Sequence, residues 1–205
     1  MAEDSRVPVS LSLDAWLDRL SQRGGEPGGG AASGVMLAIG AALLHMVAAY
    51  TPDDERAQRC GRRAVELRGD ALRAAEDDGV RSAALGAALA ADSSPERDGR
   101  IVDAGTAGGE SSATLVAIGE ALAAELRVLA DRGNPNLIAD VAVAAEAIGA
   151  GLGGALTNLR ACLALTRRHL PTGQAELPSR FDEVVRKAAA AREDVALLAR
   201  AVEER

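Results

Sequence analysis

A glycine-rich turn is the stretch of this sequence with the clearest chemical potential. Pro27 is followed by Gly28, Gly29 and Gly30, directly before a long uncharged segment. If a helix begins here, its first N–H groups lack partners inside the helix and carry the positive end of the helix dipole. Glycines leave these donors uncovered, so a flat or anionic ligand could bind to the backbone. A tight turn packed on a neighbouring element would use the same residues without any ligand.

Other side chains could also do chemistry, and each has a structural explanation. The acidic run Glu76-Asp77-Asp78 offers carboxylates for proton transfer, but aspartates are also good helix caps. His45 could act as an acid or base, although a core histidine with a satisfied ring is the favoured interpretation. His169 stands beside two arginines near an expected helix end, where a cation is favourable, so we expect a structural role.

Several classes of function are disfavoured by composition. Cys60 and Cys162 lack a CxxC partner and a histidine at ligand spacing, so the sequence predicts no metal site and no disulfide, and we expect no cofactor. A net charge of −7 without a clustered basic stripe argues against nucleic-acid binding. The first residues carry acids and no apolar signal region, so we expect a cytoplasmic protein.

The same composition predicts the fold class. The 205 residues are 48% hydrophobic but only 1% aromatic, so the core must consist of Ala, Leu, Val and Gly. Such a core suits helices that approach closely, and no sustained alternation of β-branched and polar residues indicates strands. We expect an all-α protein: a single-domain antiparallel helical bundle with a long central helix, spanning residues 1–205.

Caps, breakers and apolar periodicity place the expected helices. Ser12 can cap a first amphipathic helix, whose apolar face is expected to hold Leu13, Trp16, Leu17 and Leu20. The later helices are expected at about residues 31–50, 53–75, 79–91, 100–107, 111–131 and 137–170, with a last charged helix after Pro178.

The segment 31–50 is long enough to cross a bilayer, so a membrane span has to be considered. It consists mostly of Ala and Gly and contains His45. A central helix of a bundle is therefore the favoured interpretation, with Gly34 and Gly40 allowing neighbouring backbones to pack closely.

Three ordered blocks carry a resemblance to a known family. The first is the proline and triple glycine, followed by a small-residue helix that ends in His45-Met46-Val47 and Thr51. The others are Arg132-Gly133-Asn134 and the helix that carries Asp140, Val143-Ala144-Ala145 and Asn158. From about Ser12 to Arg160, the chain resembles the formimidoyltetrahydrofolate cyclodeaminase and methenyltetrahydrofolate cyclohydrolase family.

The resemblance implies an all-helical, generally dimeric enzyme that acts on folates. It would either hydrolyse the methenyl bridge or release ammonia from a formimino group with ring closure. The family's catalytic aspartate implies Asp78 as the proton-transfer group, with Asp77 as the fallback and His45 as an added acid or base. The implied substrate-binding residues are Pro27, Gly28, Gly29, Gly30, Asn134, Asp140 and Asn158.

Departures from the family pattern leave other functions open. After its aspartate the family has Ala-Phe and then Leu-Pro-Lys, whereas Asp78 is followed here by Gly79-Val80-Arg81-Ser82. Arg59, Arg62, Arg63 or Arg81 could replace that lysine. The alternatives are a divergent member that acts on another cyclic amidine or imine, and a non-catalytic helical interaction subunit. Asp140 could also be only a first-turn acid that the helix dipole stabilises.

Overall fold

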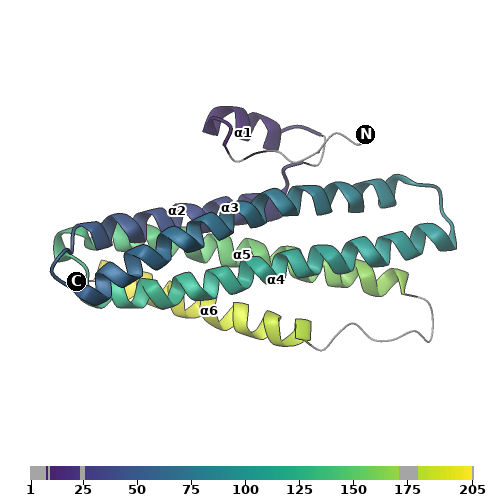
Figure 1. Ribbon diagram of the computed structural model, residues 1–205. Coiled ribbons are helices and arrows are strands. Elements are labelled where there is room, and N and C mark those ends of the chain that lie inside the picture. Colours follow the sequence, from purple (N-terminus) through teal and green to yellow (C-terminus); the bar gives the residue numbers. More distant parts are fainter. Residues whose placement is uncertain (1–7, 9, 24–25, 171–179, 205) are drawn as a thin grey trace.

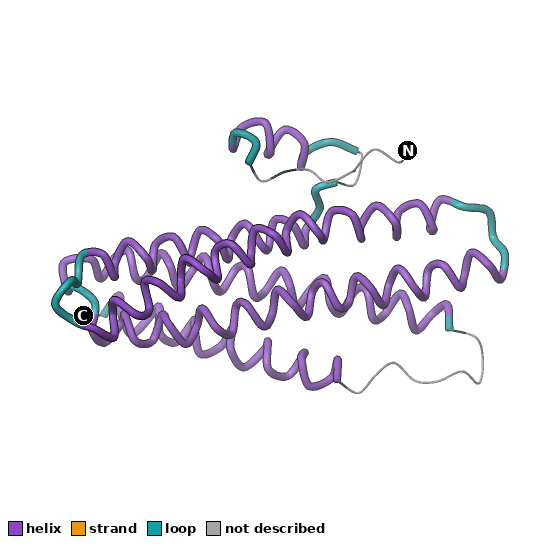
Figure 2. Tube along the Cα trace, in the orientation of Figure 1, coloured by secondary structure: helices purple, strands orange, loops and turns teal. Residues whose placement is uncertain are grey.

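The computed structural model describes residues 8, 10–23, 26–170 and 180–204. Figures 1 and 2 show that these residues form helices joined by short connections. The expected Pro171 to Pro178 linker lies outside the described residues. The helices are α1 (Leu13–Leu20), α2 (Gly29–Ala49), α3 (Glu55–Ala90), α4 (Pro95–Arg132), α5 (Ile138–His169) and α6 (Arg180–Glu203), with a 3-10 turn, η1 (Pro135–Leu137).

Helices α2 to α5 form an antiparallel bundle in which each helix packs on the next and α5 returns to α2 (Figure 1). Helix α6 lies along α5 and α4, while α1 lies outside the bundle and covers α2 and α3 through Trp16, which packs on Ala31 and Ala75. The predicted all-α antiparallel bundle is confirmed.

Two predicted helix boundaries are wrong. Residues 55–90 form one continuous helix rather than two, and residues 95–132 form another. The expected breaks lay next to glycines: Gly79 in the first case, and Gly108 and Gly109 in the second. A glycine inside a helix costs about 1 kcal/mol relative to alanine. The helices nevertheless continue through Gly79, which is buried, and through Gly109, which packs on Phe181.

The predicted apolar face of α1 is also only partly correct. Ser12 caps the helix by accepting the Ala15 N–H at 3.3 Å, as expected. Trp16 is buried, but Leu13 and Leu17 are 65% and 48% exposed. A helix of eight residues rests on the bundle along a narrow line, so it cannot bury a face four side chains wide.

Close helix packing replaces the missing aromatic bulk in the core. A Cβ on Gly34 would come within 2.8 Å of the Ala71 carbonyl oxygen, and one on Gly40 within 2.6 Å of Ile148. The expectation that these glycines let backbones approach is confirmed. Because interiors are close-packed, the small residues of α2 fix its position against α3 and α5.

The unequal lengths of the helices determine where the candidate site lies. Helix α2 has 21 residues, whereas α3, α4 and α5 have 36, 38 and 32. The N-terminus of α2 therefore lies beside the middle of the neighbouring helices rather than at an end of the bundle (Figure 1). Beyond that point, the three longer helices α3, α4 and α5 continue (Figure 1).

Two helices are long and apolar enough to cross a membrane by length and composition alone: Gly29–Ala49 and the segment Pro135–His169. From the sequence, only the segment 31–50 stood out as a possible membrane span. Both pack inside the bundle, and core helices of ordinary bundles pass the same test, so this is weak evidence for membrane insertion.

Candidate active site

Asp78 lies at the N-terminus of α2, although it belongs to the middle of α3. Its side chain is buried, and the whole residue is 5% exposed. Ser111 of α4 donates a hydrogen bond to Oδ1 at 3.1 Å, and Ser82, one turn further along α3, donates to Oδ2 at 3.4 Å. The carboxylate also accepts the backbone N–H of Ala31, near the start of α2. Three helices thus converge on this carboxyl group.

The contact with Ala31 explains much of the glycine turn. Gly28 is the N-cap residue of α2. As a glycine, it has no side chain that could accept a hydrogen bond from the first N–H groups of the helix. Asp78 occupies that role from α3, because an acid at a helix N-terminus accepts an orphan N–H and meets the positive end of the dipole. A Cβ on Gly30 would overlap the Asp78 carboxylate. The turn is bare in order to admit a side chain of the protein itself.

A cavity of about 220 Å³ opens beside Asp78. Helices α2, α3, α4 and α5 all contribute to its wall, and Leu85 and Leu165 supply apolar surface. The other lining residues are Gly29, Gly30, Asp78, Arg81, Ser82, Gly108, Ser112, Asn158, Ala161 and Cys162. A cavity that combines apolar surface with a few convergent polar groups is typical of small-molecule sites.

Ser112 contributes a buried hydroxyl to this wall. It is 1% exposed, and among the described residues its hydroxyl makes no hydrogen bond. The hydroxyl of its neighbour Ser111 donates its hydrogen bond to Asp78. A buried hydroxyl without a partner is costly, so a ligand in the cavity that bonds to Ser112 would remove that cost.

Burial raises the pKa of Asp78 above its usual range, against the opposing effects of its hydrogen bonds and of Arg81. Burial, helped by the nearby Asp78 charge, likewise raises the pKa of the Cys162 thiol, so this cysteine is a neutral wall of the cavity and a poor nucleophile. An aspartate with a raised pKa keeps its proton to a higher pH than an exposed aspartate, which makes it a better candidate for acid–base catalysis.

Two more residues named by the sequence reach this cavity. Asn158 of α5 lies against Gly29, where a Cβ would meet its Oδ1 at 3.4 Å. Arg81 donates a hydrogen bond to the Ala107 carbonyl at 3.2 Å and places a cation in the wall. Of the four arginines considered for the missing lysine, Arg81 is therefore the one that borders Asp78. Of the remaining turn residues, Pro27 is buried and Gly28 is half-buried.

The structure does not bring Asp77 and His45 into this cavity. Asp77 is exposed and lines a different hollow between α3 and α4, with Arg63 and Arg73. His45 lies near the other end of α2, and its Nδ1 is 3.2 Å from the Gly61 carbonyl oxygen. The ring has a partner, but the side chain is exposed, so the interpretation as a core histidine is wrong.

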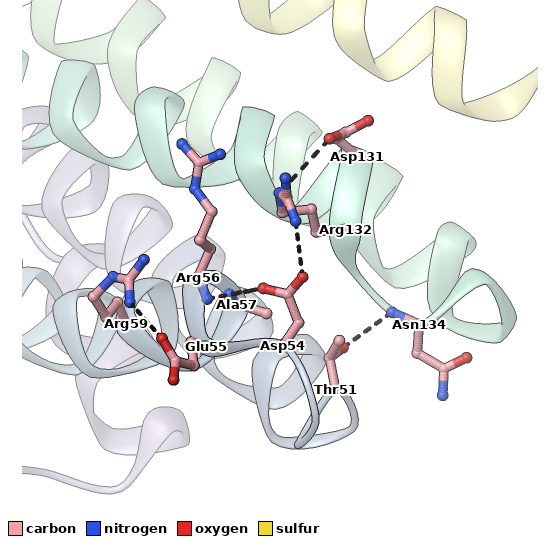
Figure 3. A network of polar contacts seen from close by, with 9 residues as sticks. All are labelled: Thr51, Asp54, Glu55, Arg56, Ala57, Arg59, Asp131, Arg132 and Asn134. Carbon is pink, nitrogen blue, oxygen red and sulfur yellow. Dashed lines mark hydrogen bonds and ion pairs between the residues drawn. The ribbon is translucent and has the colours of Figure 1, made fainter.

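Asn134 and Asp140 also lie far from Asp78 within one chain. They are at the end of the bundle where α2 has its C-terminus, whereas Asp78 lies at the N-terminus of α2. A helix of the length of α2 spans about 30 Å. Figure 3 shows the polar network at that end. The Asn134 N–H donates to Thr51 Oγ1 at 3.0 Å, and its amide donates to the Tyr50 carbonyl at 3.3 Å. Asp140 is half-buried in the first turn of α5.

Ion pairing strengthens the same end. Arg132 bonds to Asp54 at 3.0 Å, while Asp54 caps α3 by accepting the N–H groups of Arg56 and Ala57 (Figure 3). At the other end of the bundle, His169 contacts Asp98 at 2.8 Å and joins α5 to the start of α4, in agreement with its expected structural role.

Sequence reasoning missed the serines of the site. Ser82 could have been found, since it stands four residues after Asp78 and thus one helical turn away. Ser111 and Ser112 gave no usable signal, because they are more than thirty residues from Asp78 and lie next to a helix break that does not exist. Across the described part of the chain, no three His, Cys, Asp or Glu side chains are placed to hold a metal ion.

Fold and site together define a class of protein: an all-α bundle with a buried aspartate in a polar-walled cavity at an internal helix N-terminus. Comparison with protein families gives a more particular result. A family model described as formiminotransferase-cyclodeaminase matches residues 12–167, so the chain belongs to this family, as the sequence resemblance indicated. Membership indicates a folate enzyme of the cyclodeaminase type, acting on C–N bonds.

A solved structure supports the fold assignment. The structure is similar to formiminotetrahydrofolate cyclodeaminase from Thermotoga maritima, with a TM-score of 0.80 and 22% sequence identity. The match covers 95% of this chain and 96% of the other. At this identity the likeness shows a common fold. A comparison with curated proteins finds no match.

Proposed function

We propose that the protein is a folate one-carbon enzyme that opens the methenyl bridge of methenyltetrahydrofolate or closes it from the formimino derivative with loss of ammonia. Asp78 would be the proton-transfer group. The observation that carries the proposal is a buried carboxyl with a raised pKa, held by two serines beside a cavity, in a chain of this family. Cytoplasmic location and a homodimer belong to the same proposal.

In the hydrolytic direction, ionised Asp78 removes a proton from a water molecule as its oxygen adds to the methenyl carbon. The positive charge of the amidinium is lost and a tetrahedral carbon forms. One of its two C–N bonds then breaks, Asp78 returns the proton to the departing nitrogen, and the hydroxyl group loses its own proton to water, which leaves a formyl group on the other nitrogen. The carboxylate stabilises the cation before the reaction and moves the proton during it.

In the deaminating direction, the second folate nitrogen adds to the formimino carbon and its proton passes to the exocyclic imino nitrogen, so that a tetrahedral carbon again forms. Protonated Asp78 gives its proton to the exocyclic nitrogen, which leaves as ammonia while the bridge closes. One group must therefore act in both protonation states, and burial places the pKa of Asp78 in the direction that permits this.

The cavity wall supplies contacts for the substrate. The Ser112 hydroxyl and the Asn158 amide can hydrogen-bond to the polar edge of a pterin, and Leu85 and Leu165 can contact its faces. Arg81 replaces the cation that the family's lysine would supply, which favours folate use over another cyclic amidine.

The proposal is tested by following the loss of methenyltetrahydrofolate absorbance and the release of ammonia from the formimino compound. We expect one of these rates to exceed the uncatalysed rate and Asp78→Asn to reduce it about 100-fold or more, the range of general acid–base catalysis. Asp77→Asn is the matched variant, because it removes the adjacent carboxylate on another helix face. Loss of activity on replacing Asp77, with Asp78→Asn active, would overturn the assignment.

A further inference from the structure

A second, larger hollow adjoins the Asp78 cavity. It has a volume of about 740 Å³ and lies between α2, α5 and α6. Gly29 and Asn158 line both hollows, so the two meet at the N-terminus of α2. The floor is open because α5 carries Gly149, Gly153 and Gly154 there. Gly29 and the Asn158 side chain lie against each other at this boundary, so a molecule longer than the Asp78 cavity would reach the groove by passing over them.

Arg192 of α6 borders the groove. Its guanidinium lies across Gly153, where a Cβ would come within 3.2 Å of Nε and 3.4 Å of Cζ. A Cβ at position 153 would require this side chain to shift by a few tenths of an ångström. Among the described residues, Arg192 forms no ion pair.

The basic character continues beyond Arg192. A neighbouring hollow of about 390 Å³ shares Arg192 and Ala196 with the groove and is also lined by Arg160 and Arg200. In the part of the chain that the structure describes, neither arginine pairs with an acid. The acids that face the two hollows are Glu146 and Glu193, so arginines outnumber them.

Other charges of α6 are used differently. Asp194 accepts from Arg127 of α4 at 2.7 Å, and Arg180 pairs with Glu110 of α4. These pairs fasten α6 to the bundle on its α4 side. Arg192 points to the α5 side, where it makes no such attachment and remains available to an anion.

We propose that the groove along Arg192 is an anion subsite that holds the carboxylate end of an elongated substrate whose reacting head lies beside Asp78. The inference rests on the proposed function, since a folate has a flat head and an anionic tail. Arg160 and Arg200 extend the site for tails with additional carboxylates. Arg192 and Arg200 lie outside residues 12–167, so this part of the specificity belongs to the C-terminal helix rather than to the matched family region.

The test compares methenyltetrahydrofolate with methenyltetrahydropteroate, which has the same head without the glutamate. Arg192→Ala is measured in the full chain beside Arg186→Ala, an exposed arginine of the same helix away from these hollows. We expect Arg192→Ala to raise KM for the folate about tenfold, the scale of a charged hydrogen bond, with kcat unchanged. KM for the pteroate stays unchanged, and Arg186→Ala changes neither.

Two results would overturn the subsite: an equal change of KM for both compounds, or no change for either. A shift of the Arg192→Ala protein in size-exclusion chromatography would also overturn it, because the groove would then be an interface between copies of the chain. If the wild type turns over neither compound, the proposed function fails, and equilibrium binding of folic acid and pteroic acid decides the subsite separately. The subsite is supported if Arg192→Ala binds folic acid more weakly than the wild type does and binds pteroic acid equally well. It is rejected if the wild type does not bind folic acid.

Discussion

The Asp78 carboxylate occupies the space that a side chain on Gly30 would need. The two residues are far apart in the sequence, yet this contact joins the start of α2 to the middle of α3. It keeps the acid buried at the positive end of a helix dipole while one side of it faces the cavity. The glycine turn and the acidic cluster are therefore one structural unit.

Replacing Gly30 by alanine should disable this unit. The new Cβ would overlap the carboxylate, so Asp78 must rotate away from Ser111 and from the Ala31 N–H. Because displacement of a reacting group by about 1 Å can reduce a rate about 100-fold, we expect kcat/KM to fall on that scale. Steady-state kinetics on the folded variant measure the effect.

Gly86→Ala is the control for this prediction. Gly86 lies on α3, and nothing is within 4 Å of the position where its Cβ would be placed. Alanine there should leave kcat/KM unchanged and stabilise the protein by about 0.5–1 kcal/mol, because glycine weakens a helix. Unchanged kinetics in Gly30→Ala would show that the Asp78 position does not matter for the reaction.

Asp78→Asn should become relatively more stable as the pH rises. Burial raises the folded-state pKa of Asp78 above the ordinary value of 3.8, so the folded protein retains a proton that the unfolded chain releases. Below 3.8 both states are protonated and the group has no effect. Above it the wild type loses stability until the pH passes the folded pKa, and above that value the full loss remains.

The amide of asparagine does not ionise, so the variant avoids this loss. Urea unfolding of both proteins at pH 4 and pH 8 measures the difference in free energy of unfolding at each pH. We expect this difference to move in favour of Asp78→Asn at pH 8. A difference that is constant with pH, or that moves in favour of the wild type, would show that burial does not destabilise the ionised form.

Local signals predicted the fold and part of the site. The apolar periodicity, the Ser12 cap and the glycine turn are short-range features, and they placed α1, α2 and α5 well. Asp78 and Asn158 were found through the family motif. The serines and the second hollow depend on which residues of different helices face one another, and no pattern along one helix encodes that. The helix break expected near Asp78 was wrong for the same reason. Asp78 can lie inside a helix because its hydrogen-bond partners are on α2 and α4, which the local sequence does not reveal.

Ser112→Ala should weaken substrate binding without weakening the fold. The wild-type hydroxyl is buried with no hydrogen-bond partner in the described structure, so its removal relieves a desolvation penalty. If the substrate uses this hydroxyl, KM rises about 2- to 10-fold, the value of one neutral hydrogen bond. Kinetics and thermal unfolding are measured together, and an unchanged KM would remove Ser112 from the binding site.

Ser111→Ala should shift the pH profile rather than the affinity. The Ser111 hydrogen bond lowers the pKa of Asp78 against the larger effect of burial. Without it the pKa rises further, so the limb of the kcat/KM profile that reports Asp78 moves to higher pH. Ser112→Ala serves as the neighbouring control, since Ser112 does not bond to the carboxylate. A limb that stays in place would dissociate that ionisation from Asp78.

Thr51→Val should reduce stability and leave catalysis intact. Thr51 Oγ1 accepts the Asn134 N–H at 3.0 Å and donates to the Val47 carbonyl at 2.9 Å, so valine leaves a backbone donor without its partner. We expect a loss of about 1–3 kcal/mol, the cost of an unsatisfied group of this kind. Thermal unfolding and kcat/KM are compared with those of Asn134→Ala. Equal kinetics in both variants assign Asn134 to this end of the bundle, whereas a raised KM in Asn134→Ala alone would make it a substrate contact, supplied from a second copy of the chain.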